Sequence, residues 1–304
     1  MMPAKKTFYS FLVSFSILSL AAFSSASPDV AKNEAAKEVM TIEVEKKSNG
    51  AHTTHWTYEG ETGPEHWGDL NPDFAACKNG KEQSPINIET SQVIEDEKTA
   101  DLVINYKPTE FSLSNNGHTI QGNPLTKNNS LIVDNKEYKL TQFHLHTPSE
   151  HQINGKNFDL EFHFVNENAT NQLAVLGLMV KEGASNPLLE KAWNVIPSEE
   201  TTVAVKLTEP IDLMSLLPKD TDSFQYKGSL TTPPCSEDVK WIVLEEPIEV
   251  SKEQIDKFRN IFPDNHRPVQ SLNKREVKKK IKKNIQKSYE AKKALQFIKM
   301  GLIA

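Results

Sequence analysis

The chain has 304 residues, of which 37% are hydrophobic and 25% charged, and its formal net charge is −6. These values are ordinary for a soluble globular protein, and the negative charge gives no reason to expect a nucleic-acid partner. The length fits either one large domain or two ordinary ones, because all-β domains often exceed about 200 residues as a single unit.

Residues 1–26 are typical of an export signal. Two lysines precede the apolar, serine-containing run Phe8–Phe23, and Ser24 and Ala26 offer a cleavage site of small residues. A membrane anchor is the alternative, but the run is short and rich in serine. We therefore expect a mature chain that begins near Ser27 and is exported, to the periplasm or outside the cell.

Residues 27–54 are rich in Ala, Lys, Glu and Ser and have no sustained apolar period, which predicts a flexible leader. Residues 55–273 are predicted to form one mainly β (α+β) domain. Its apolar segments are short, rich in Val, Ile, Phe and Leu, often alternate with polar residues, and are separated by turn residues. They include 102–106, 130–146, 158–166, 172–180 and 240–250.

Helical patterns in this domain are confined to short pieces such as 186–196 and 251–262. We therefore predict a large twisted, mostly antiparallel β-sheet with short peripheral helices.

Residues 274–304 form a basic tail with 11 Lys and Arg against 2 Glu. Val277, Ile281, Ile285 and Tyr289 recur at every fourth position, which predicts an amphipathic helix. Such a helix could dock on the acidic body of the protein, lie on an anionic membrane surface, or remain solvated without a partner.

Cys77 and Cys235 are the two cysteines of the chain. In an oxidising compartment, two cysteines far apart in sequence are a candidate disulfide. The alternative is a pair of free, buried thiols.

Three histidines have the spacing of a metal site. His144 and His146 are two residues apart in a predicted strand and therefore project from the same face. A catalytic zinc site uses three protein ligands and keeps one position for water, and His163, in a later strand, is the candidate third ligand. Gln142 and Glu161 each lie two residues before a proposed ligand, where they can accept its N–H and fix its tautomer.

The alternative is that these are hydrogen-bonded core histidines. His151 is not expected to bind metal, and the remaining histidines are interpreted as surface or framework residues: His52, His55, His66 and His266.

Several long motifs resemble those of the α-class carbonic anhydrases, in the order and at the approximate spacings of that family. The resemblance covers about Trp56–Lys274 and rests on QSPINI (Gln83–Ile88), NNGHT (Asn115–Thr119), QFHLHTPSEH (Gln142–His151), LEFHFV (Leu160–Val165), LAVLG (Leu173–Gly177) and GSLTTPPCSE (Gly228–Glu237). It implies a zinc enzyme that interconverts carbon dioxide and bicarbonate through zinc-bound hydroxide.

The resemblance also implies roles for individual residues. The zinc ligands are His144, His146 and His163, with Gln142 and Glu161 as their hydrogen-bond partners. Thr231 is the gatekeeping hydroxyl that donates to Glu150, and His118 is the proton shuttle. The apolar wall beside the metal consists of Val165, Val175, Leu230 and Trp241, with the polar Thr232 at the mouth. Cys77 and Cys235 match the disulfide pair of secreted members, many of which are homodimers.

Two other interpretations remain open from the sequence. His144, His146 and Glu150, with Gly155 further on, approximate the first metal motif of a cupin, in which Glu150 is a ligand for iron or manganese; Tyr138, however, stands where that motif begins with glycine. A catalytically inactive binding protein on the anhydrase scaffold is the second, although such proteins typically lose one or more of the ligand histidines.

Overall fold

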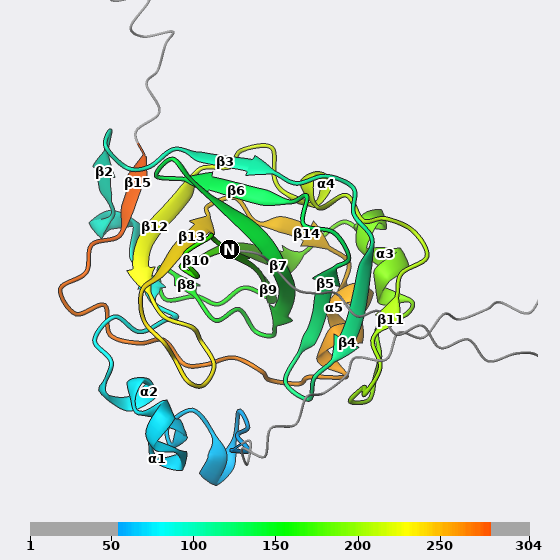
Figure 1. Cartoon of the computed structure of the whole chain (residues 1–304), viewed down its shortest axis with the longest axis horizontal. Coiled ribbons are helices and arrows are strands. Elements are labelled where there is room, and N and C mark those ends of the chain that lie inside the picture. The colour runs from blue at the N-terminus through cyan, green and yellow to red at the C-terminus, as the bar shows by residue number, and fades with distance from the viewer. Residues whose placement is uncertain (1–53, 281–304) are drawn as a thin grey trace, which may run out of the picture. The chain divides into compact units, whose positions relative to one another are not determined.

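A computed structural model describes residues 54–280 of the chain (Figure 1). The predicted signal peptide, nearly all of the predicted leader and the tail beyond Lys280 lie outside these residues and stay predictions. Within 54–280, no helix combines the length and the apolar composition that crossing a bilayer requires.

The prediction of a mainly β fold is confirmed. One sheet dominates, and along its main path the strands follow the order β11-β4-β5-β7-β9-β10-β13-β12-β15-β2, with β3, β6 and β14 paired beside it. Its strands are β2 (Ile94–Asp96), β3 (Leu102–Asn105), β4 (Phe111–Asn115), β5 (Ile120–Pro124), β6 (Ser130–Val133), β7 (Lys136–His146), β9 (Leu160–Glu167), β10 (Leu173–Glu182), β11 (Val205–Lys206), β12 (Ser223–Gly228), β13 (Val239–Leu244), β14 (Ile248–Val250) and β15 (Lys278–Lys280).

Most pairings in this sheet are antiparallel; β10 with β13, β10 with β14 and β15 with β2 are parallel. A separate two-stranded parallel ribbon joins β1 (Asn87–Ile88) to β8 (Gln152–Ile153).

The helices are short, as predicted. Figure 1 shows α3 and α5 side by side and α1 and α2 grouped apart from them. The α-helices are α1 (Trp67–Leu70), α2 (Ala76–Asn79), α3 (Pro187–Trp193), α4 (Leu213–Leu216) and α5 (Lys252–Arg259), and the 3-10 turns are η1 (Gly60–Thr62), η2 (Pro72–Phe74) and η3 (Thr90–Gln92). The helix α5 begins at a capping box, in which Ser251 accepts the N–H of Gln254 and the Gln254 side chain accepts the N–H of Ser251.

Strand β9 explains why the site lies inside the protein. Seven of its eight residues are buried, because the sheet is covered on both faces here. Phe162 and Phe164 belong to the larger apolar core, whereas Val165 belongs to a second core on the opposite face. Since side chains alternate along a strand, Glu161 and His163 share the face of Val165.

The described start of the basic tail differs from the predicted helix. Lys278–Lys280 form β15, which pairs with β12 and with β2, and the preceding Val277 is buried. The sheet edge supplies backbone partners that a four-residue sequence period does not reveal, and this tertiary pairing overrides the local pattern. The lysines of β15 reach acidic groups: Lys279 contacts Glu245, and Lys280 Nζ lies 2.7 Å from Asp101.

Candidate metal centre

The register of two strands brings the three predicted ligands together. In the β7–β9 pairing, His144 lies directly opposite His163, and His146 lies opposite Glu161. One ligand nitrogen from each of His144, His146 and His163 falls within 4.8 Å of the other two. His146 and His163 are buried and His144 is partly exposed, so His144 is the member of the group nearest to solvent.

An oxygen atom close to one nitrogen of each imidazole indicates which nitrogen remains available. His144 Nδ1 lies 2.8 Å from Gln142 Oε1, and His146 Nδ1 lies 2.7 Å from the backbone oxygen of Asn265. His163 turns its other nitrogen, Nε2, toward Oε1 of Glu161, 3.0 Å away, although the contact lacks the angles of a hydrogen bond. The nitrogens left for a metal are therefore Nε2 of His144, Nε2 of His146 and Nδ1 of His163.

The donor set fits a metal ion. Nε2 of His146 is buried and has no hydrogen-bond partner among residues 54–280, and an unpaired buried polar atom is costly unless something binds it. Burial lowers the pKa of all three histidines and brings that of His146 to about 4. Each ring is therefore neutral at pH 7 and has a lone pair to donate, and three imidazoles in this arrangement are a donor set that suits zinc.

A second group, His151 with Glu161 and His163, is also compact enough to hold a metal. Its hydrogen bonds argue against that role. His151 Nδ1 lies 2.8 Å from Glu161 Oε1, and its Nε2 lies 2.7 Å from the hydroxyl of Tyr226, so both ring nitrogens are engaged. We interpret this group as the support of His163.

Glu161 is a buried carboxylate with four partners. Its Oε2 accepts the backbone N–H groups of Glu150 and His151 at 2.9 and 2.8 Å, and its Oε1 faces His151 and His163. Burial acts to raise its pKa, but the two histidines hold that pKa well below its usual range. Gly177 on β10 leaves room for the carboxylate, since a Cβ there would lie 3.0 Å from Oε1.

Glu150 and Thr231 lie at the same centre, although no hydrogen bond of ordinary geometry joins them. Glu150 Oε1 accepts the backbone N–H of Arg267 at 2.8 Å, and Oε2 is buried without a hydrogen-bond partner in the described chain. Oε2 lies 3.5 Å from His146 Nε2. Burial raises the pKa of Glu150, while His163 and the Thr231 hydroxyl oppose that rise. Thr231 is therefore near enough to act on the carboxylate.

Adjacent strands place the predicted apolar wall. Val165 pairs with Val175, and Val175 pairs with Trp241, so the three form a row across β9, β10 and β13. The Trp241 ring lies 4.8 Å from that of His163 and its Nε1–H donates to Ser229 O at 2.9 Å. Leu230 packs against the apolar cluster that contains Val165, Val175 and Trp241. Thr232, two residues after Leu230, is partly exposed.

His118 lies in the turn between β4 and β5, as its sequence predicts. The turn is held by Asn116, whose Oδ1 accepts the N–H groups of His118 and Thr119 at 3.0 and 2.9 Å. The imidazole stacks on Trp56, with ring centroids 3.7 Å apart. Burial lowers its pKa, His55 lowers it further and Glu200 opposes the change.

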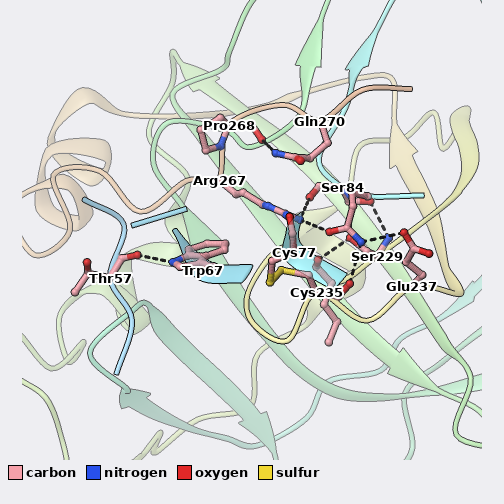
Figure 2. Close-up of a disulfide and its surroundings, with 12 residues drawn as sticks. Thr57, Trp67, Cys77, Ser84, Ser229, Cys235, Glu237, Arg267, Pro268 and Gln270 are labelled. Atoms are coloured by element: carbon pink, nitrogen blue, oxygen red, sulfur yellow. Dashed lines mark hydrogen bonds between the residues drawn. A yellow bond between two sulfur atoms is a disulfide. The ribbon is translucent and has the colours of Figure 1, made fainter. Parts of the chain in front are cut away.

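A disulfide joins Cys77 to Cys235 (Figure 2). Buried beside it is Arg267, whose guanidinium donates to the backbone oxygen of Cys77 at 2.9 Å and to that of Ser84 at 2.8 Å (Figure 2). Because the backbone N–H of Arg267 also binds Glu150, this residue connects the disulfide to the metal centre.

Three participants were missed by the sequence analysis: Asn265, Arg267 and Tyr226. Asn265 and Arg267 belong to the segment DNHRP, and each is at most 1% exposed. The sequence feature that could have pointed to Asn265 and Arg267 is that DNHRP is polar and lies inside the region that resembles the family. It does not indicate which of these polar side chains is buried.

The sequence profile described as eukaryotic-type carbonic anhydrase matches residues 62–281. A carbonic anhydrase of Pectobacterium atrosepticum is 43% identical over 229 residues, which are 75% of this chain and 92% of that protein. The structure of an α-carbonic anhydrase from Thermovibrio ammonificans, in complex with the inhibitor sulfanilamide, is 46% identical with a TM-score of 0.71 and covers 74% of this chain and 99% of that chain.

A structure of dioscorin complexed with ascorbate is also similar, with 31% identity and a TM-score of 0.70 over 75% of this chain and 99% of that chain.

Proposed function

The chain belongs to the eukaryotic-type carbonic anhydrase family, and we propose that it hydrates carbon dioxide reversibly at a zinc ion bound by His144, His146 and His163. The observation that carries this proposal is the convergence of three neutral imidazole nitrogens within 4.8 Å, each on a ring whose other nitrogen faces an oxygen acceptor. When bound, zinc acidifies the water in its open coordination position so that it ionises near pH ~7.

Thr231 and Glu150 would orient the attacking oxygen. An ionised Glu150 can only accept hydrogen bonds, so the Thr231 hydroxyl, once it donates to Oε2, has only lone pairs to offer the nucleophile. The Glu150 position is fixed by the backbone N–H of Arg267. Catalytic hydrogen bonds are often long in ligand-free structures and shorten when the reactants bind, which reconciles this role with the geometry between Thr231 and Glu150.

The apolar wall would hold the carbon dioxide. This substrate is apolar and binds weakly, so it requires a surface that water does not compete for. Val165, Val175 and Trp241 are buried at the base of that wall, and Leu230 and Thr232 are its more exposed members.

His118 would carry the product proton to buffer. An imidazole has a pKa close to that of a zinc-coordinated water, so transfer is nearly balanced in energy. The half-buried position of His118 in a surface turn lets it exchange protons with solvent.

We also propose that the protein works outside the cytoplasm. Its Cys77–Cys235 disulfide supports an oxidising compartment, and the N-terminal 26 residues have the composition of an export signal. Carbon dioxide and bicarbonate are the proposed substrate and product, and a homodimer remains a prediction from the resemblance.

Stopped-flow hydration of carbon dioxide tests this proposal. The zinc-loaded protein is expected to be active, a chelator to abolish activity, one equivalent of zinc to restore it, and sulfanilamide to inhibit it as expected for a relative of the Thermovibrio enzyme. Fully zinc-loaded protein without hydration activity would instead favour a binding protein on this scaffold. The cupin interpretation is wrong, because the family match covers the whole site.

A further inference from the structure

Asn265 contacts His146, one of the proposed metal ligands, and also the turn that carries His118. Its backbone C=O accepts from His146 Nδ1 at 2.7 Å. Its side-chain Nδ2 donates to the backbone oxygens of His118 and Leu145 at 2.9 and 3.0 Å, and its Oδ1 accepts the N–H of Thr147 at 2.7 Å. Asn265 is completely buried, so water does not compete for these bonds.

These bonds lie where regular strand pairing ends. The last pair of β5 with β7 on the side of the turn is Gln121 with His144. Beyond it, side chains make the connection: the Thr119 hydroxyl donates to Leu145 O at 2.6 Å, and Asn265 spans the rest. The position of the turn relative to β7 is thus set by two side chains, the Thr119 hydroxyl and the Asn265 amide, in place of a backbone ladder.

We propose that Asn265 is a positioning residue for proton transfer, which fixes the separation between His118 and the metal centre. The inference rests on the proposed function, in which His118 accepts the product proton. The Asn265 amide bonds the backbone of His118 itself to the end of β7. Its removal leaves the Thr119 hydroxyl as the remaining side-chain link described here, so the turn can shift without removing any proposed ligand. Transfer steps are sensitive to such shifts, and a displacement of about 1 Å can cost roughly 100-fold in rate.

The test compares Asn265→Ala with Asn129→Ala. Asn129 is a matched control because it is 1% exposed, donates to Thr109 Oγ1 at 2.8 Å and accepts the N–H of Lys107 at 2.6 Å, and it takes no part in the proposed site. Both zinc-loaded variants are assayed for kcat in weak buffer and for kcat/KM, since kcat then reports proton transfer and kcat/KM reports hydration.

For Asn265→Ala we expect kcat in weak buffer to fall about 10-fold, kcat/KM to change less than about 3-fold, and added imidazole to restore kcat. The Asn129→Ala variant should keep both parameters. A second readout is the NMR signal of the His118 imidazole, assigned from its loss in His118→Ala, which should shift or broaden in Asn265→Ala and not in the control.

Equal losses of kcat and kcat/KM, or no loss in either, would overturn the inference. If wild-type protein is inactive, the proposed function fails; if it is active and His118→Ala is rescued by imidazole while Asn265→Ala behaves like its control, only the inference fails. Should Asn265→Ala not fold, Asn265→Asp keeps the acceptor for Thr147 and removes the donor. In the unmodified protein, rapid solvent exchange of both Asn265 Nδ2 protons would also contradict the inference.

Discussion

Glu161 faces His163 from the same side of strand β9, with Oε1 3.0 Å from Nε2. The same oxygen faces His151 Nδ1 at 2.8 Å, and the other carboxylate oxygen accepts two backbone N–H groups. The carboxylate is therefore held ionised, and its negative charge beside Nε2 of His163 favours a proton on that nitrogen, which leaves the lone pair on Nδ1.

Replacing Glu161 by glutamine tests this support. The amide keeps the volume but removes the negative charge that orients His163, so we expect zinc affinity to fall about 10- to 100-fold. Competition with a chromophoric chelator measures that affinity. Gln142→Glu is the matched comparison at His144, where the added charge should not weaken zinc binding. Unchanged zinc affinity in Glu161→Gln would show that the charge of Glu161 is unimportant.

Removal of His118 should slow turnover only when buffer is scarce. The His118→Ala variant loses the proposed proton acceptor and keeps all three ligands, so kcat in weak buffer should fall about 10-fold or more and recover with imidazole. Stopped-flow assays at several buffer concentrations measure this. His66→Ala, at an exposed histidine outside the proposed site, is the control. Normal turnover of His118→Ala in weak buffer would remove His118 from the mechanism.

The disulfide should be a major source of stability. It closes a loop with a sequence separation of 158 residues, for which the chain-entropy relation gives about 5 kcal/mol. The double variant that combines Cys77→Ser and Cys235→Ser is compared with the oxidised, unmodified protein. Urea unfolding of both measures the difference in their free energies of unfolding. Equal stability of the two proteins would contradict this estimate.

The metal-free protein should lose stability as the pH falls. Burial lowers the pKa of His146 to about 4, against about 6.5 for an unfolded chain. Below pH ~6.5 the unfolded state binds a proton that the folded state does not, so stability declines between pH ~6.5 and ~4, by about 3 kcal/mol from this group. Urea unfolding across that range tests it, and a His146→Asn variant should show a shallower decline.

Two shortened chains test the role of β15. A chain that ends at Glu276 lacks the buried Val277 and the contacts of Lys279 and Lys280, whereas a chain that ends at Lys280 keeps them. We expect the shorter chain to be less stable by about 2–4 kcal/mol, of which the buried valine accounts for about 1.5. Thermal unfolding compares the two; identical melting temperatures would show that β15 is dispensable.

The sequence alone determined the sheet-rich fold, and it singled out the three candidate ligand histidines with their neighbours Gln142 and Glu161. The fold prediction and the choice of histidines both rest on local periodicity, because alternation predicts strands and residues two apart in a strand share a face. For the same reason, Glu161 could be assigned to the side of His163 without a structure.

Other features depended on contacts between distant segments. Residues 278–280, which the sequence placed in a helical tail, form strand β15, because β12 and β2 offer backbone partners; the prediction for residues 281–304 lies outside the described chain. Asn265 and Arg267 carry no local period, yet both are buried against the metal centre by the packing of a loop 117 to 119 residues away from Glu150 and His146. Side-chain spacing along one strand can be deduced from the chain, whereas hydrogen bonds between remote segments exist only once the tertiary fold has excluded water around them.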